Sequence, residues 1–268
     1  MSRTSILFFG DIVGDHSLKF LRDNLDELKL RYPSDFIIAN GENTWEGKGI
    51  NEQEANSLFN RGVDCITTGN HIWENWKSRP LLDSDPRVLR PHNYPQENPG
   101  TGYYLVEKNG QKLAVIQVQG RVFMQPIDCP FKAVDELIDK AKQETNLIFV
   151  DFHAETTAEK MAMAWHLDGR ASALIGTHTH IQTGDASIFP HGLGYLTDVG
   201  MTGAYDSVLG MDKDIALKRV KLQTAHKFEL AFGDVRIAGV HITLDSASGK
   251  ALKVQPFMYP KFENSVIG

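Results

Sequence analysis

Short apolar runs alternate along this chain with segments that carry the spacing of an amphipathic helix. Residues 5–10 (SILFFG) have the composition of a buried strand. The next segment repeats leucines at steps of three and four, as one helix face does: Leu18, Leu21, Leu25 and Leu28. The pattern recurs, with a strand expected within 35–40 and a helix over 51–61. This alternation is typical of βαβ units and predicts a mostly parallel sheet.

Antiparallel strands join this plan in the middle and at the end of the chain. Residues 103–120 carry Asn109-Gly110 between two apolar runs, which is a strong hairpin signal. Residues 228–259 have the pattern of an antiparallel meander. We find no repeat, linker or low-complexity tract, so we expect a single domain, residues 1–268, with two packed β layers.

Composition and charge narrow the function. A chain of 268 residues with 41% hydrophobic and 23% charged residues can bury a full core. The net charge of -6 argues against non-specific nucleic-acid binding, which needs a basic face to displace counterions from phosphates. A small phosphorylated substrate stays compatible with this charge if a metal holds it.

Cellular context follows from cysteine usage and from the apolar runs. Cys65 and Cys129 are the two cysteines, and their neighbours resemble neither a disulfide framework nor a zinc ribbon. We therefore expect a reducing compartment, the cytoplasm. No signal peptide is recognisable and no apolar stretch nears 18 residues, so no membrane span is expected.

Polar loops follow five of the expected strands: GDIVG, NGEN, TTGNHIW, VDFHAE and GTHTH. Ligands of α/β sheets bind at the carboxyl ends of strands, so we expect these loops to converge on one crevice. In the last loop, a strand that continues through Thr179 would aim His178 and His180 at one target. The candidate site residues are Asp11, Glu42, Asn43, Asn70, His71, His153, His178 and His180.

Carboxylate, amide and imidazole ligands without thiolates suit iron, manganese or zinc. Eight such groups exceed one ion's needs and suit two ions about 3.5 to 4 Å apart, with a bridging carboxylate and hydroxide, as in phosphoryl displacement. Each residue also has a simpler reading, since Asp11 could cap a helix, Asn43 and Asn70 could close turns, and His153 could be an interior histidine. Glu42 resists such a reading, because a buried carboxylate needs an ion or a donor.

The motifs resemble a known superfamily. GD near the N-terminus, GNH, a later isolated His and G-x-H-x-H form a pattern similar to the calcineurin-like metallophosphoesterases. The longer strings look like the YmdB-like branch and cover residues 6 to about 212: GDIVG, IIANGEN, TTGNHIW, QGRVFMQPIDCPF, VDFHAE, GTHTHIQT and TDVGMTGAYDSVLGM.

The resemblance implies a four-layer αββα metallophosphoesterase sandwich that hydrolyses 2',3'-cyclic nucleotides such as 2',3'-cAMP, or related small phosphodiesters, by metal-bridged hydroxide attack. Two divalent ions are implied, iron or manganese, with zinc and magnesium open. By the same resemblance Asp11, Asn43 and His180 hold the first ion, and Asn70, His153 and His178 the second. Glu42 bridges them, and His71 is the proton donor.

The chain departs from the general superfamily at two places. The superfamily has a histidine two residues after the first Asp and an Asp at the second motif, where this chain has Val13 and Glu42. The YmdB-like branch shares this departure, with Asn43 filling the vacancy. The identity of the first metal is therefore open.

Other functions stay open from the sequence. One is a regulatory module that binds a nucleotide or an RNA end and hydrolyses it only incidentally, and another is a phosphomonoesterase or protein phosphatase. Asp198 could orient a ligand histidine, Met201–Tyr205 could line the cleft, and Arg121 could meet a phosphate or a surface carboxylate. Edge strands near the C-terminus would permit a homo-oligomer.

Overall fold

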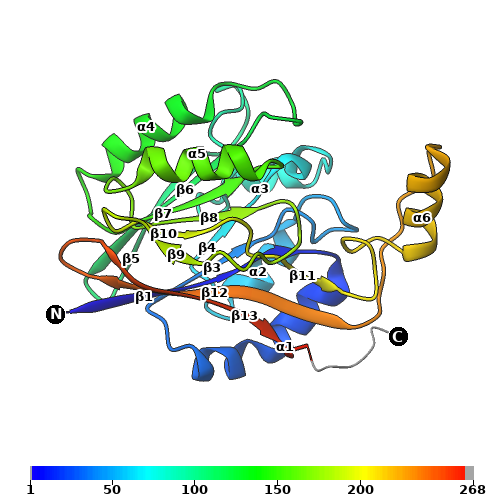
Figure 1. Ribbon diagram of the computed structural model, residues 1–268, viewed down its shortest axis with the longest axis horizontal. Coiled ribbons are helices and arrows are strands. Elements are labelled where there is room, and N and C mark those ends of the chain that lie inside the picture. Colours follow the sequence, from blue (N-terminus) through cyan, green and yellow to red (C-terminus); the bar gives the residue numbers. More distant parts are fainter. Residues whose placement is uncertain (1, 263–268) are drawn as a thin grey trace.

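The computed structural model describes residues 2–262, which form two β-sheets with helices on their outer faces (Figure 1). The first sheet contains three neighbouring parallel strands, β1 (Arg3–Phe9), β3 (Phe36–Asn40) and β4 (Cys65–Thr67), with β4 at its edge. Its other strands are β2 (Asp11–Ile12), β11 (Met201–Ala204), β12 (Val235–Asp245) and β13 (Ala251–Tyr259). β12 runs antiparallel to β1, β11 and β13.

The second sheet has the order β5-β6-β7-β8-β10-β9. Its strands are β5 (Tyr103–Lys108), β6 (Gln111–Gln119), β7 (Ile148–His153), β8 (Ala173–Thr177), β9 (Ser187–Ile188) and β10 (Gly194–Leu196). The four strands from β6 to β10 in this order are mutually parallel, and β5 and β9 flank them as antiparallel strands. Both sheets are therefore mixed, and the second has its parallel strands at the centre.

Helices complete four layers. The first sheet packs against α1 (Asp15–Arg31), α2 (Glu52–Phe59) and α3 (Ser78–Ser84), and the second against α4 (Pro130–Ala141) and α5 (Thr157–Leu167). Figure 1 shows α4 and α5 on one side of the sheets and α1 on the other. A third core lies between the sheets. The predicted αββα sandwich is confirmed.

Strand β1 illustrates why the sheets are buried on both faces. Ile6 and Phe8 belong to the core between the sheets, whereas Leu7 and Phe9 belong to the core beneath the helices. Successive side chains of a strand point to opposite faces, so a continuous apolar run fills both cores. Phe8 meets Phe149 of the other sheet edge to face, with ring centroids 5.0 Å apart.

Local signals placed several elements correctly. Asn51 caps α2 in a full capping box with Glu54, as expected for the helix predicted over 51–61. Asn109 and Gly110 join β5 and β6 with φ of 52° and 74°, the left-handed conformations that a type I′ turn requires.

One prediction of structure was wrong, and two helices were not predicted. Residues 228–232 are not a strand of the C-terminal meander, because β11 takes the place beside β12 and leaves this segment only one bridge, Met211 to Leu230. The helix α3 was not predicted from the sequence. The helix α6 (Lys213–Leu222) was not predicted at all, and in Figure 1 it stands away from the two sheets.

Within residues 2–262, no helix is both long enough and apolar enough to cross a membrane.

The contact between the sheets predicts a stability difference. Phe149→Ala should lower the free energy of unfolding by about 3–5 kcal/mol, because it empties space in the central core. The matched variant Phe123→Ala, at a position 89% exposed, should change it by less than about 0.5 kcal/mol. Urea unfolding of both variants checks this, and equal effects would contradict the assigned core.

Candidate metal centre

The five predicted loops converge where parallel strands of both sheets end. Asp11 follows β1, Glu42 follows β3, and Asn70 begins the 3-10 helix η1 (Asn70–Trp73) after β4. His153 ends β7, and the loop after β8 carries His178 and His180. Donor atoms from both sheets therefore meet in one place.

One group of donors surrounds the Nε2 atom of His153, a fully buried side chain. Glu42 Oε1 and Asn70 Oδ1 lie 3.0 Å from this nitrogen, and His178 Nδ1 lies 3.1 Å from it. Atoms that converge this closely from three other residues have the chemistry of a shared cation site.

A second group shares Glu42 with the first. Ligand atoms of Asp11, Glu42 and His180 all lie within 4.8 Å of one another. Asn43 pairs in a β-bridge with Val13, two residues after Asp11, and its carbonyl oxygen accepts from the Gly14 N–H at 2.9 Å. Glu42 is thus common to two neighbouring donor groups.

Buried oxygens at this place lack hydrogen-bond donors. Asp11 Oδ1 and Asn43 Oδ1 have no hydrogen-bond partner in the described chain, and Glu42 Oε1 meets the Nε2 atom of His153 at 3.0 Å. The amide of Asn43 donates to the Gly47 carbonyl oxygen at 2.9 Å, so its side chain does close a turn while its oxygen stays free. Buried acceptors without donors are costly unless a cation compensates them, so these residues fit metal binding.

Each imidazole of the cluster has one nitrogen fixed by an acceptor outside it. His153 Nδ1 lies 2.9 Å from Thr177 Oγ1, and His180 Nδ1 donates to the Leu209 carbonyl oxygen at 3.0 Å. His178 Nε2 lies 3.1 Å from Glu155 Oε2. The other nitrogen of each ring is left to face the donor groups, which is how metal-binding histidines are oriented.

A buried carboxylate sets the orientation of His153. Asp151 accepts hydrogen bonds from Thr177 Oγ1 at 2.7 Å, Thr67 Oγ1 at 2.5 Å and Asn40 Nδ2 at 3.0 Å. Since the Thr177 hydroxyl gives its one proton to Asp151, it accepts from His153 Nδ1. The Nε2 atom of His153 therefore faces the cluster, where it can carry a proton toward Glu42 or bind a cation in its place.

The backbone that carries the two histidines of GTHTH has a different conformation from the predicted one. β8 ends at Thr177, and His178 and His180 have φ of 98° and 65°, so the strand does not continue through Thr179. Asp198 Oδ2 holds this bend by accepting from the Thr179 N–H at 3.0 Å and from Thr179 Oγ1 at 2.7 Å. Left-handed backbone at non-glycine residues is rare and costs energy that surrounding contacts must offset.

The electrostatics of the cluster favour positive charge. Burial would raise the pKa of Glu42, but the neighbouring His153 outweighs it and lowers this pKa to about 2. Burial would lower the pKa of His153, but Glu42 outweighs it and raises this pKa to about 9. Burial, and then His153, lower the pKa of His178 to about 3. The negative charge that stabilises a proton on this buried imidazole would stabilise a metal cation in the proton's place.

Gly69 leaves the space that the cluster needs. A Cβ at this position would lie 2.3 Å from both Glu42 Oε2 and His153 Nε2. Real Cβ atoms do not approach polar atoms so closely, so only glycine fits here without displacing the donors.

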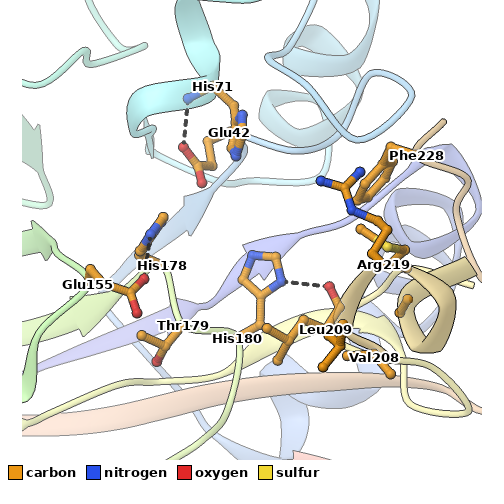
Figure 2. Close-up of a pocket in the computed structure, with 13 residues that line it drawn as sticks. Glu42, His71, Glu155, His178, Thr179, His180, Val208, Leu209, Arg219 and Phe228 are labelled. Carbon is orange, nitrogen blue, oxygen red and sulfur yellow. Dashed lines mark hydrogen bonds and ion pairs between the residues drawn. The ribbon is translucent and has the colours of Figure 1, made fainter. Parts of the chain in front are cut away.

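A cavity of about 350 Å³ opens beside the donor groups. Figure 2 shows His71 and Glu42 on one wall, His178 with Glu155 on another, and Arg219 with Phe228 facing them. His71 is only partly buried, and its Nδ1 lies 2.6 Å from Glu74 Oε1, which leaves Nε2 free. The geometry therefore places an imidazole next to the donor groups but outside them.

Several contributors were not selected from the sequence. Asp151 and Glu155 stand in VDFHAE, and a carboxylate two positions before His153 in a buried strand was a usable signal. Arg219 had no signal, because α6 was not predicted, and Phe228 was assigned to the predicted meander rather than to the site.

The residues left open from the sequence have structural places. Asp198 meets the Thr179 backbone rather than an imidazole ring, and also pairs with the buried Lys160 at 2.8 Å. Met201–Ala204 is a buried strand and does not line the cavity. The backbone N–H of Arg121 donates to Glu159 Oε1 at 3.1 Å, and Arg121 is not among the cavity residues.

Comparison with known proteins gives the family. The chain matches the family model of the YmdB-like protein over residues 7–257. It is 46% identical over 250 residues to the 2',3'-cyclic-nucleotide 2'-phosphodiesterase of Bacillus subtilis (strain 168), covering 93% of this chain and 95% of that protein.

Two solved structures share the fold at comparable identity. A hypothetical protein from Thermus thermophilus has a TM-score of 0.88 and 39% identity, covering 95% of this chain and 98% of that one. A novel phosphatase from Mycoplasma pneumoniae has a TM-score of 0.89 and 32% identity, covering 96% of this chain and 94% of that one. The chain therefore belongs to the YmdB-like family of metallophosphoesterases, as its motifs predicted, and it is a metal-dependent phosphoesterase.

Proposed function

We propose that this protein is a dinuclear-metal phosphodiesterase that hydrolyses 2',3'-cyclic nucleotides such as 2',3'-cAMP. The observation that carries the proposal is the pair of donor groups that share Glu42. Asp11, Asn43 and His180 would hold one divalent ion, and Asn70, His153 and His178 the other. The name of the Bacillus subtilis relative supports the substrate class.

Iron or manganese is the expected metal, with zinc and magnesium open, since the donor set combines imidazole nitrogens with carboxylate and amide oxygens. Divalent ions, when bound, supply Lewis acidity and activate water for attack on phosphorus. The protein's own residues position this chemistry. Asp151 and Thr177 orient His153, Glu155 orients His178, and Gly69 keeps the space between donors clear.

His71 is the proton donor in this proposal. The ribose oxygen that leaves phosphorus needs a proton, and an imidazole nitrogen beside the donor groups can give it. Glu74 fixes the ring through Nδ1, and Lys48 pairs with Glu74 on the far side. The free Nε2 is then the atom that delivers the proton.

We also infer that the chain forms one domain, acts in the cytoplasm and associates with a second copy. Strands of both sheets contribute to the core between them, which supports one domain. Cys65 and Cys129 are free thiols, which suits a reducing compartment. Within residues 2–262, β13 pairs with β12 alone, so it offers an edge for a second copy, and sedimentation would detect the resulting oligomer.

Replacing His71 tests the proton donor. His71→Ala should lower kcat for 2',3'-cAMP by about 10²- to 10⁴-fold, while metal content stays unchanged, because the ring assists the leaving group and does not hold the ions. Assays with 3',5'-cAMP and p-nitrophenyl phosphate run alongside. Wild-type protein that holds metal but turns over only p-nitrophenyl phosphate would instead make this a phosphomonoesterase, and turnover of no substrate would favour a regulatory binding role.

Filling the space at Gly69 tests the centre itself. Gly69→Ala should lower the metal bound per chain and the turnover together, because the new methyl group occupies the space between Glu42 and His153. Gly184→Ala is the matched control, since a Cβ there meets nothing within 4 Å. Elemental analysis of both folded variants gives the result, and an unchanged metal content in Gly69→Ala would rule out this location.

A further inference from the structure

The cavity beside the donor groups has two chemically different halves. Glu42, His71, His178 and His180 line the half next to the proposed ions. The other half is largely apolar and comes from the segment around α6, with Leu209, Val220 and Phe228 among its side chains. A volume of about 350 Å³ exceeds what a phosphate alone would fill and lies in the range of small-ligand sites.

Phe228 is held so that its ring can take part in binding. The ring packs against Gly47, where a Cβ would approach Phe228 to 3.2 Å. Gly47 has φ of +85°, a conformation that disfavours other residues, so the ring rests on bare backbone. Phe228 is still 36% exposed although it is a large apolar side chain. Figure 2 shows it on the cavity wall opposite His178.

Arg219 stands beside Phe228 on the same wall (Figure 2). Its Nη1 donates to the His226 carbonyl oxygen at 2.9 Å, which anchors the guanidinium and leaves its other N–H groups to the cavity. Within residues 2–262, Arg219 forms no ion pair with a carboxylate. Five other arginines do: Arg31, Arg61, Arg87, Arg170 and Arg236. An anchored guanidinium without a counter-ion is available to a ligand.

We propose that Phe228 and Arg219 form a nucleobase subsite, in which Phe228 stacks on the base and Arg219 donates to acceptor atoms on the base edge. This inference rests on the proposed function, which puts the phosphate of the substrate at the donor groups. The sugar then extends away from Glu42, and the base reaches the apolar half of the cavity. Aromatic stacking accepts any base, whereas the guanidinium favours bases with acceptors on the facing edge.

Binding measurements with and without a base test the subsite. Adenosine 3'-monophosphate and ribose 3-phosphate carry the same phosphate and differ in the base. Calorimetry on the metal-loaded wild-type protein should show adenosine 3'-monophosphate binding about 5- to 150-fold more tightly, the equivalent of one stacked base. Phe228→Ala should remove most of this difference in affinity, because it weakens the binding of adenosine 3'-monophosphate and leaves the binding of ribose 3-phosphate unchanged.

Variants separate the subsite from a general loss of structure. Phe232→Ala is the matched control, because Phe232 lies in the same segment, is 71% exposed and does not line the cavity. Phe232→Ala should keep the difference in affinity between the two ligands. Phe228→Trp should keep it too, because the larger ring still stacks. Arg219→Ala should reduce the difference in affinity between the two ligands without changing the affinity for ribose 3-phosphate.

Two results would contradict the proposed subsite. One is that wild-type protein binds the two ligands with equal affinity, and the other is that Phe228→Ala keeps the difference in affinity between them. Failure of the proposed function is a separate outcome. In that case the wild-type protein binds adenosine 3'-monophosphate more tightly than ribose 3-phosphate but does not hydrolyse 2',3'-cAMP. This result would support the subsite and contradict the phosphodiesterase assignment.

Discussion

Two buried carboxylates, Asp11 and Glu42, impose the constraint on which the rest of the site depends. Both side chains are fully buried; Asp11 Oδ1 has no hydrogen-bond donor in residues 2–262, and Glu42 Oε1 meets the imidazole of His153. Burial raises the pKa of Asp11 well above its usual range, whereas His153 holds the pKa of Glu42 low. Two buried carboxylates destabilise an empty core and are stabilised by bound cations. The surrounding structure is therefore best understood as the support of a cation-binding site.

The sandwich meets this constraint by bringing strand ends from two sheets together. Asp11 and Glu42 come from the first sheet, and His153, His178 and His180 come from the second. A sheet core fixes the positions of strand ends more rigidly than a long loop could, and the orienting hydrogen bonds then aim each ring. The left-handed turns at His178 and His180 store local strain that the contacts of Asp198 offset.

Sequence patterns predicted the layers and the residues at the strand ends, because apolar periodicity and polar strand termini are local properties. They missed what depends on tertiary contact. The bend after Thr177 could not be predicted, since Asp198 holds it from another part of the chain. The helix α6 has only Ala216 buried, so its sequence lacks the apolar stripe that reveals most helices. The cavity wall that it contributes therefore had no sequence signal.

The central claim is that two ions share the carboxylate of Glu42, and anomalous X-ray diffraction from crystals loaded with manganese tests it most directly. We expect two anomalous peaks about 3.5–4 Å apart, one on each side of that carboxylate. One peak lies near Asp11, Asn43 and His180, and the other near Asn70, His153 and His178. A single peak, or two peaks that do not share Glu42, would contradict it.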